Sequence, residues 1–234
     1  MRVALIIPAA GEGKRIGGRV PKAFIPVAGK PLIIHTLLNI KRAIAFEEIV
    51  VAIAVNRTRL ARQVLDRFGF PQVRLASGGA TRAESVWNAL QTVSPRCHWI
   101  LVHDAARPLI ESQSVRKLLK EVKYQKAGLL VEPVSSTVKE VRARGAFVRR
   151  TLDRSKLYLA QTPQVARRDV LLKAYEKLGR HAFAMTDESA ILEKAGVEVK
   201  MVVGSSRNIK ITTREDLKLF SLQLLTPNSK LRTS

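Results

Sequence analysis

Glycine and basic residues are concentrated near the start of the chain, in the stretch IIPAAGEGKRIGGRVPKAF from Ile6 to Phe24. Gly11 and Gly13 directly follow an apolar run, and glycine lets a backbone approach a ligand closely. The positive charge of the stretch comes from Lys14, Arg15, Arg19 and Lys22. Lys and Arg side chains on a glycine-rich loop favour phosphate groups as ligands. The stretch therefore predicts a polyphosphate site.

Three known phosphate-binding templates do not fit this stretch. A Walker loop needs the pattern GxxxxGK[ST], which GEGKRIG does not supply. A dinucleotide fingerprint has a third glycine where Ile16 stands and an acidic residue about twenty positions later. No Asp or Glu occurs between Lys14 and Phe46. Because the protein-kinase motifs are absent as well, the loop belongs to a different class of phosphate site.

A second group of chemically suitable residues is HDAARP, from His103 to Pro108. Asp104 ends an apolar segment, and a carboxylate at the ligand side of a buried strand is well placed for Mg²⁺ or its bound waters. The alternative is a turn with a local ion pair between Asp104 and Arg107. The four histidines are scattered along the chain, so we expect His103 to be structural.

Predicted strands and helices alternate along the first two-thirds of the chain, and these elements could position the two groups of residues. Thr81 and Glu84 form a capping-box pattern at the start of one predicted helix. The predicted strands are Met1–Pro8, Glu48–Val55, Val73–Ala76, Trp99–His103 and Gly128–Val134, and the predicted helices are Pro31–Arg42, Thr58–Phe68, Thr81–Val93 and Ser112–Gln125. This alternation predicts an α/β fold, a Rossmann-like, mostly parallel open sheet flanked by helices.

The pattern changes between Thr137 and Gln164, where apolar and polar residues alternate with a period of two. A turn at Arg144-Gly145 makes this segment a predicted β-hairpin. It is rich in basic residues and has little apolar surface to bury on its own domain, so we expect residues 137–160 to protrude as a dimerisation arm. The remaining predicted elements are the helices Asp169–Leu178, Glu188–Ala195 and Arg214–Leu225 and the strand Val197–Val203. We expect one domain over residues 1–226 and a flexible tail over residues 227–234.

Composition limits the class of protein. The 234 residues carry a formal net charge of +22, with a pI of about 11.0, which calls for an anionic partner. Only 5% of residues are aromatic and no RNA-binding or zinc-finger pattern is present, so we expect no specific nucleic acid. No segment resembles a membrane span or signal peptide, which predicts a cytoplasmic protein without membrane contact. The single cysteine, Cys97, is predicted to be a buried apolar residue.

Several motifs together resemble one enzyme family. PAAGEGKR with VPKAF resembles the opening of nucleotidyltransferases of the sugar-nucleotide type. The later motifs narrow the match and extend it from about Ile6 to Leu225: GGATRAESV, VHDAARP, PVSSTVK, TPQ, TDE and NIKIT. Together they resemble the 2-C-methyl-D-erythritol 4-phosphate cytidylyltransferase family of non-mevalonate isoprenoid biosynthesis.

The resemblance implies that a phosphate oxygen of methylerythritol phosphate attacks the α-phosphorus of CTP and expels pyrophosphate. A phosphate monoester has its second pKa near 6, so the nucleophile needs no general base at neutral pH. The site must instead hold two anions in line and stabilise the developing charge, with Mg²⁺ as the implied cofactor. A homodimer is implied too, through the 137–160 arm.

Residue roles follow from the same resemblance. The implied catalytic cations are Arg15, Lys22 and Lys210. The implied nucleotide-binding residues are Ala9, Ala10, Gly11, Gly13, Gly79 and Ser85. The implied substrate-binding residues are Asp104, Arg107, Thr137, Arg154, Thr162 and Thr186, with Asp104 also near the metal, directly or through water. Without the resemblance, Ser85 would be an ordinary polar helix position and Lys210 an exposed lysine at a strand end.

Two departures and two alternatives remain open. Arg207 stands where the family often has an acid, and Ala80 replaces a position that is frequently polar. Ribitol 5-phosphate cytidylyltransferases share most of these motifs, so ribitol phosphate is an alternative substrate. The charge of +22 leaves a nucleic-acid-binding protein on the same fold as a second alternative.

Overall fold

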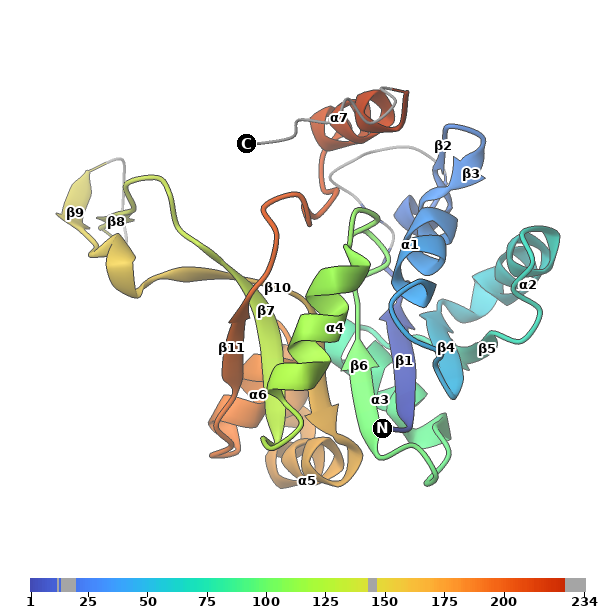
Figure 1. The fold of residues 1–234 in the computed structure, drawn as a ribbon, viewed down its shortest axis with the longest axis horizontal. Helices are drawn as coiled ribbons and strands as arrows, with labels where there is room; N and C mark the ends of the chain where they lie inside the picture. The colour runs from blue at the N-terminus through green and yellow to red at the C-terminus, as the bar shows by residue number, and fades with distance from the viewer. Residues whose placement is uncertain (12, 14–19, 143–146, 226–234) are drawn as a thin grey trace.

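A seven-stranded sheet forms the centre of the protein, whose computed structural model describes residues 1–11, 13, 20–142 and 147–225 (Figure 1). The strand order is β11-β7-β10-β6-β1-β4-β5. All strands run parallel except β10, which is antiparallel to both neighbours. The strands are β1 (Val3–Pro8), β4 (Glu48–Ile53), β5 (Arg74–Ser77), β6 (Trp99–Val102), β7 (Ala127–Pro133), β10 (Tyr158–Arg167) and β11 (Lys200–Val203).

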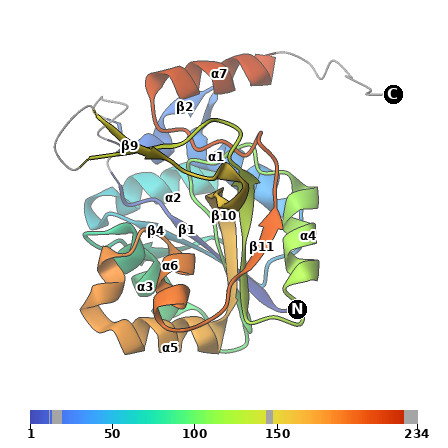
Figure 2. The ribbon, with the colours of Figure 1, turned by 90° about the vertical axis from the view of Figure 1, so that its left-hand side faces the viewer.

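Helices cover both faces of this sheet. Alternate residues of β1 serve two cores, with Leu5 on one face and Ile6 on the other, both fully buried. The first core is closed by α1, α2 and α4, and the second by α3, α5 and α6, as Figure 2 shows for α4 against α3, α5 and α6. Burial on both faces explains why the inner parallel strands β1, β4 and β6 are almost entirely apolar, whereas the outer strands β5 and β11 are mostly exposed. The helices are α1 (Leu32–Lys41), α2 (Thr58–Arg67), α3 (Arg82–Thr92), α4 (Ser112–Glu121), α5 (Arg168–Leu178), α6 (Glu188–Lys194) and α7 (Arg214–Leu225).

Short elements connect the layers. The predicted cap of α3 is confirmed, since the Thr81 hydroxyl accepts a hydrogen bond from the Glu84 N–H at 3.1 Å. The Glu84 carboxylate accepts from the N–H of Ala80 instead of closing a capping box on Thr81. The remaining short elements are η1 (Lys22–Phe24), η2 (Val55–Arg57), η3 (Arg154–Lys156), η4 (Gly179–Ala184) and the strands β2 (Pro26–Val27) and β3 (Lys30–Pro31).

The predicted arm extends away from the body of the protein (Figure 1). Its strands β8 (Lys139–Val141) and β9 (Val148–Thr151) pair only with each other within the described residues. Every described residue of β9 is exposed, and Val141 and Phe147 are 57% and 72% exposed. The predicted turn at Arg144-Gly145 lies outside the described residues. The arm therefore has apolar side chains and no core of its own.

The second half of the predicted hairpin belongs elsewhere. From Tyr158 onward the chain is β10, which lies between β6 and β7 in the main sheet. The prediction of one hairpin to Gln164 was wrong because a period of two does not specify which strand is the partner. The pairing of β10 with β7 is irregular between Ala160 and Gln164, where Pro163 has no N–H to donate.

The α/β fold with its mostly parallel sheet is otherwise confirmed. Helix α4 ends at Glu121, four residues before the predicted end, because after the buried Val122 the residues 123–126 are exposed, Tyr124 by 85%, and add nothing to the core. Cys97 is fully buried, as predicted. Within the described residues no helix has the length and apolar character to cross a bilayer. The single-domain boundary stays a prediction, and the tail from residue 226 lies outside the described residues.

A small third core attaches α7 to the rest of the protein. Phe220 is fully buried, and its ring centroid lies 5.2 Å from that of His35 in an edge-on arrangement. It shares this cluster with Val27, Leu32, Ala106 and Ile211. The N–H of Ile211 donates to the carbonyl of Ala106 at 2.8 Å. Phe220 thus fixes the segment that precedes α7 against the loop after β6.

We predict that Phe220→Ala lowers the free energy of unfolding by about 3 to 5 kcal/mol, because the substitution leaves a cavity in this cluster. Leu219→Ala is the matched control, since Leu219 is 55% exposed on the same helix. Urea unfolding followed by circular dichroism measures both variants. Equal losses in the two variants would contradict the anchoring role.

Candidate active site

A cavity of about 560 Å³ opens at the carboxyl ends of β1 and β6. This is where open α/β sheets bind their ligands. Its wall comes from the loop after β1, η1, the start of α3, the loop after β6 and the segment before α7. The predicted residues that line it are Ala9, Ala10, Gly11, Gly13, Lys22, Gly79, Ser85, Asp104 and Lys210. Residues from separate motifs therefore meet in one place.

Lys22 connects the opening loop to the end of the chain. It follows Pro21 and begins η1, and its Nζ donates to the carbonyl of Ile211 at 3.0 Å. Gly13 has a φ of +70°, and a Cβ added there would lie 2.5 Å from the Cβ of Lys22. Gly13 is therefore required for the close approach of the loop to Lys22.

The loop after β5 packs tightly against the opening loop. A Cβ added to Gly78 would lie 2.3 Å from the Cβ of Ala10. The hydroxyl of Ser85 accepts from the N–H of Gly79 at 3.0 Å and donates to the carbonyl of Thr81 at 2.8 Å. Ser85 is 2% exposed, so its first task is to hold this loop at the cavity wall.

Among the described residues that line the cavity, Asp104 is the acidic one, and cations from distant segments surround it. Its Oδ2 lies 2.7 Å from Nζ of Lys210, and its Oδ1 accepts from Nε of Arg82 at 2.9 Å. The Nε of Arg107 lies 3.9 Å from Oδ2. Burial opposes ionisation of Asp104, but Arg82 and Lys210 outweigh it and hold the pKa of the carboxyl well below its ordinary value. Asp104 is therefore charged at neutral pH.

The structure adds Arg82 and Glu188 to the site. The two guanidinium NH groups of Arg82 donate to the two oxygens of Glu188, at 2.9 and 3.0 Å. Both residues lie in quoted motifs, GGATRAESV and TDE, but they are 106 positions apart in the sequence. No pattern within the chain pairs residues that far apart, so the sequence could mark them only as motif members.

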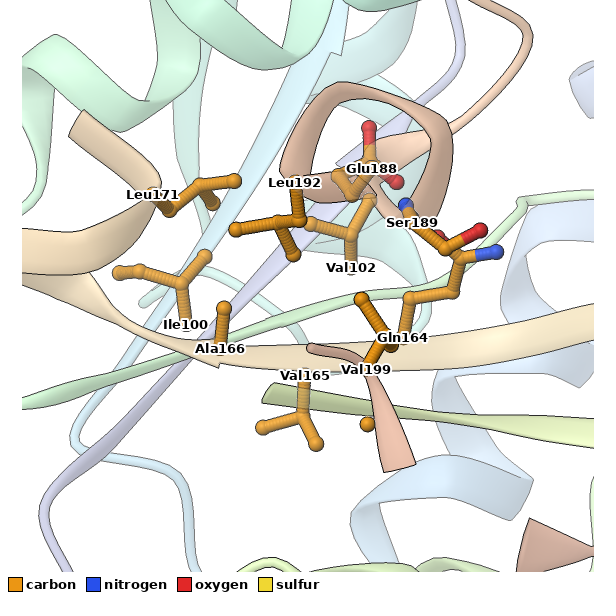
Figure 3. Close-up of a pocket in the computed structure, with 11 residues that line it drawn as sticks. Ile100, Val102, Gln164, Val165, Ala166, Leu171, Glu188, Ser189, Leu192 and Val199 are labelled. Carbon is orange, nitrogen blue, oxygen red and sulfur yellow. Dashed lines mark hydrogen bonds between the residues drawn. The ribbon is translucent and has the colours of Figure 1, made fainter. Parts of the chain in front are cut away.

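Glu188 begins α6 and has an apolar surrounding. Figure 3 shows its carboxyl group beside an apolar crevice that Val102, Leu171 and Leu192 help to form. The crevice leaves no room for a water molecule. Burial raises the pKa of Glu188, and the pairing with Arg82 counteracts that effect. Arg82 therefore compensates two buried carboxylates, those of Glu188 and Asp104.

Thr162 and His103 hold the loop that carries Asp104 in place through hydrogen bonds. The Thr162 hydroxyl accepts from the N–H of Asp104 at 3.0 Å and lies 3.0 Å from Nδ1 of His103. His103 is fully buried, and burial lowers its pKa to about 4. A neutral, enclosed imidazole agrees with the structural role expected for His103. The predicted direct contact between Thr162 and the substrate stays untested, and Thr162 does not line the cavity.

Other predicted residues lie outside the cavity wall. Arg107 donates to the carbonyls of Asn208 at 2.6 Å and Ala160 at 3.3 Å. Thr137, Arg154 and Thr186 are exposed, and Arg154 donates to the carbonyl of Ser135. Arg15 lies outside the described residues. The structure of one chain therefore does not bring the arm residues to its own cavity.

The two departures from the family pattern have local consequences. The side chain of Arg207 is 64% exposed, and its guanidinium lies 4.0 Å from the Glu111 carboxylate. This position therefore supplies no negative charge to balance Lys210, as an acidic residue there would. Lys210 is paired with Asp104 instead. Ala80 contributes its backbone N–H to Glu84.

The donor set of the cavity fits a metal ion carried by the substrate. The described residues contain no cluster of three or more His, Cys, Asp or Glu side chains suited to a metal. Asp104 supplies the carboxylate of the described cavity wall, and both of its oxygens already face cations. Mg²⁺ often binds through one carboxylate together with substrate phosphates. Asp104 fits that role, whereas a resident ion held only by protein side chains does not fit.

Comparison with known proteins agrees with this geometry. The sequence model of the family described as IspD, 2-C-methyl-D-erythritol 4-phosphate cytidylyltransferase, matches residues 3–225. This chain belongs to that family. The cytidylyltransferase of Solibacter usitatus is 41% identical over 235 residues, covering 96% of each chain, and that of Mannheimia succiniciproducens is 36% identical over 222 residues, covering 95% of this chain and 96% of its own.

Solved structures of the cytidylyltransferase family share the fold. The 4-diphosphocytidyl-2C-methyl-D-erythritol synthase from Anaerococcus prevotii aligns with a TM-score of 0.83 at 28% identity, covering 96% of this chain and 99% of its own. The cytidylyltransferase from Francisella tularensis aligns with a TM-score of 0.79 at 34% identity, covering 95% of this chain and all of its own. The family and the fold predicted from the sequence are thereby confirmed.

We predict that Arg82→Met lowers the free energy of unfolding by about 3 to 5 kcal/mol, because it leaves the Glu188 carboxylate buried without a partner. Adding Glu188→Gln should recover much of this loss, since the double variant buries no unpaired charge at that position. Urea unfolding of the two single variants and the double variant measures the coupling. Additive losses would contradict the compensating role of Arg82.

Proposed function

We infer that this chain transfers CMP from CTP to 2-C-methyl-D-erythritol 4-phosphate, giving 4-diphosphocytidyl-2-C-methyl-D-erythritol and pyrophosphate. The observation that carries the inference is the cavity at the carboxyl ends of β1 and β6, which Lys22 and Lys210 line together with Gly11 and Gly13 of the glycine-rich loop. Family membership over residues 3–225 supports the same reaction and favours methylerythritol phosphate over ribitol phosphate.

The reaction needs positioning and charge stabilisation rather than a general base. A phosphate oxygen of methylerythritol phosphate forms a bond to the α-phosphorus of CTP, and the bond to the β-phosphate breaks with its electron pair leaving on pyrophosphate. The phosphate monoester is already mainly a dianion at neutral pH. His103, with its low pKa and full burial, takes no part in proton transfer. Lys22 and Lys210 would stabilise the charge that develops on the phosphoryl oxygens.

The base would lie against the loop after β5. The hydroxyl of Ser85 donates once and accepts once within the protein, so one lone pair remains. The amino group of cytosine is a suitable donor to it. Gly79 would let the backbone of this loop approach the base closely. A side chain at this position would also collide with Glu84, because an added Cβ would lie 2.3 Å from its Cγ.

Mg²⁺ forms part of this proposal. When bound with the triphosphate, it supplies charge neutralisation for the phosphates. Asp104 would hold the ion, directly or through water, and Lys210 would keep the carboxylate ionised. A cytoplasmic location stays a prediction.

A homodimer is proposed through the arm, residues 137–160. Thr137 and Arg154 lie on the arm segment and not in the wall of the chain's own cavity. The arm also exposes Val141, Phe147 and Val148, and burying these side chains against a second chain is favourable. A second copy would cover these apolar side chains and bring Thr137 and Arg154 to a substrate.

The test of function is pyrophosphate release with CTP, Mg²⁺ and either methylerythritol phosphate or ribitol phosphate. We expect release with methylerythritol phosphate only, and ATP, GTP and UTP to be poor substitutes for CTP. Release with ribitol phosphate alone would replace the proposed substrate. No release with any pair would remove the proposed activity.

We predict that Lys22→Ala lowers turnover by about 10² or more, because one donor to the transition state is lost. Lys30→Ala is the control, since Lys30 is an exposed lysine in the neighbouring β3. Steady-state kinetics and circular dichroism of both variants provide the comparison. Near-normal turnover of a folded Lys22→Ala variant would remove Lys22 from the catalytic set.

We predict that the double variant Phe147→Asp, Val148→Asp is monomeric and has a raised KM for methylerythritol phosphate, because charge replaces two exposed apolar side chains of the arm. Val55→Asp is the control, since Val55 is 71% exposed in η2, outside the arm. Light scattering gives the mass of each variant. An unchanged dimer in the double variant, or a monomeric wild type, would contradict the proposed interface.

A further inference from the structure

A second cavity, of about 660 Å³, lies at the opposite edge of the sheet. We call it the basal cavity; it is lined by residues of three segments, 95–99, 123–126 and 167–169. Segment 95–99 leads into β6, segment 123–126 leads into β7, and segment 167–169 begins with the last residue of β10. The basal cavity therefore lies at the amino ends of the parallel strands β6 and β7. The active-site cavity lies at their carboxyl ends. In Figure 1 the basal edge is the lower one, near α5, whereas α7 is at the upper edge.

The charge of the basal cavity is strongly unbalanced. Its cationic wall residues are Lys123, Lys126, Arg167 and Arg168, and its acidic residue is Asp169. Asp169 accepts from Nε of Arg167 at 3.3 Å on the surface, which compensates one of the four cations. Lys126 makes no side-chain hydrogen bond or ion pair with the described residues. Four cations therefore line one concave surface whose described wall contains a single acidic residue.

Arg168 has an unsatisfied donor at this place. Its Nε is buried and has no hydrogen-bond partner among the described residues, while another guanidinium nitrogen donates to the carbonyl of Val93 at 3.4 Å. A buried donor of a charged group without a partner is unfavourable. The Nε itself is closed to solvent, so an anion in the cavity would accept from it only after the Arg168 side chain shifts.

The basal cavity is built on the ends of strands rather than on loop tips. Arg167 is the register partner of Trp99 in the pairing of β10 with β6. The N–H of Arg167 donates to the carbonyl of Lys126, and that of Arg168 donates to the carbonyl of His98, both at 2.9 Å. The backbone of the two arginines is therefore fixed before any ligand binds, which reduces the entropy lost on binding.

We propose that the basal cavity binds a small molecule with a polyphosphate group. Guanidinium groups and ammonium groups together suit linked phosphates, because Arg gives forked hydrogen bonds and Lys gives point charges. The volume is in the range of small-molecule sites, roughly 300 to 1,000 Å³. Tyr124 is 85% exposed at the rim, and the ammonium of Lys123 lies over its ring, 5.4 Å from the centroid. A base or another flat group on the ligand would therefore stack on the opposite face of the ring.

The chain provides a direct reporter for this site. It has two tryptophans, and Trp99 lines the basal cavity, whereas Trp87 packs on Tyr175 with ring centroids 5.2 Å apart. In a Trp87→Phe background, tryptophan fluorescence comes from Trp99 alone. Inorganic pyrophosphate is the probe. Pyrophosphate is also a product of the proposed reaction and can bind in the active site. The Trp99 signal separates the two sites, because Trp99 lines the basal cavity.

We predict a saturable change in Trp99 fluorescence, with half-saturation below about 1 mM pyrophosphate. Lys123→Glu with Lys126→Glu should raise the half-saturation concentration at least tenfold, and Arg168→Lys, which keeps the charge but removes the guanidinium, should raise it several-fold. Lys22→Ala should leave it unchanged, since Lys22 lines the other cavity. Two exposed lysines elsewhere, Lys173 and Lys194, changed together to Glu, give the matched charge control.

If both double charge reversals, at Lys123 and Lys126 and at Lys173 and Lys194, weaken pyrophosphate binding equally, the proposal is overturned. Such a result would mean that the net charge of the protein alone attracts pyrophosphate. A linear, non-saturating response would overturn it too. A site that binds a random RNA oligonucleotide but not pyrophosphate, with the same sensitivity to Lys123 and Lys126, would replace the small molecule by nucleic acid. None of these results depends on cytidylyltransferase activity.

Discussion

The charge of Asp104 is the constraint on which the site depends. A carboxylate at the end of a buried central strand is stable only when cations compensate it. Lys210 and Arg82 do so from the segment before α7 and from the start of α3. Arg82 in turn is held by Glu188 at the start of α6. One ionised group thereby fixes three elements that are distant in the sequence, and their positions define the wall of the cavity.

The same segment before α7 closes the other side of the cavity. Ile211 donates its N–H to Ala106 and accepts from Lys22 through its carbonyl. The adjacent Lys210 reaches Asp104, and Phe220 anchors the helix that follows. Apolar packing of Phe220 and ionic pairing of Lys210 therefore act on the same few residues. The opening loop and the carboxyl-terminal segment can only be positioned together.

The sequence predicts those parts of the molecule that depend on local patterns. The buried strands show as apolar runs, α3 shows through its Thr81 cap, and the glycine-rich loop shows through its glycines and basic residues. The position of β10 has no such signal, since its alternation fits an isolated hairpin as well as a strand in the sheet. Arg82 and Glu188 are equally hidden, because a polar residue at a helix start is commonly a solvated one. Only their meeting in three dimensions makes them a buried ion pair.

The antiparallel direction of β10 explains how one sheet can carry two anion-binding edges. In an all-parallel sheet the carboxyl ends of the strands share one edge, and the ligand groups gather there. Strand β10 starts on the arm side and ends at Arg167 on the opposite edge. Between these ends, its Thr162 hydroxyl accepts from the N–H of Asp104. It therefore delivers two arginines to an edge where parallel strands only begin. Since β6 runs from one edge to the other, the cations of the basal cavity are separated from those around Asp104 by the length of this strand. Both groups of cations can then be retained in one small protein without direct mutual repulsion.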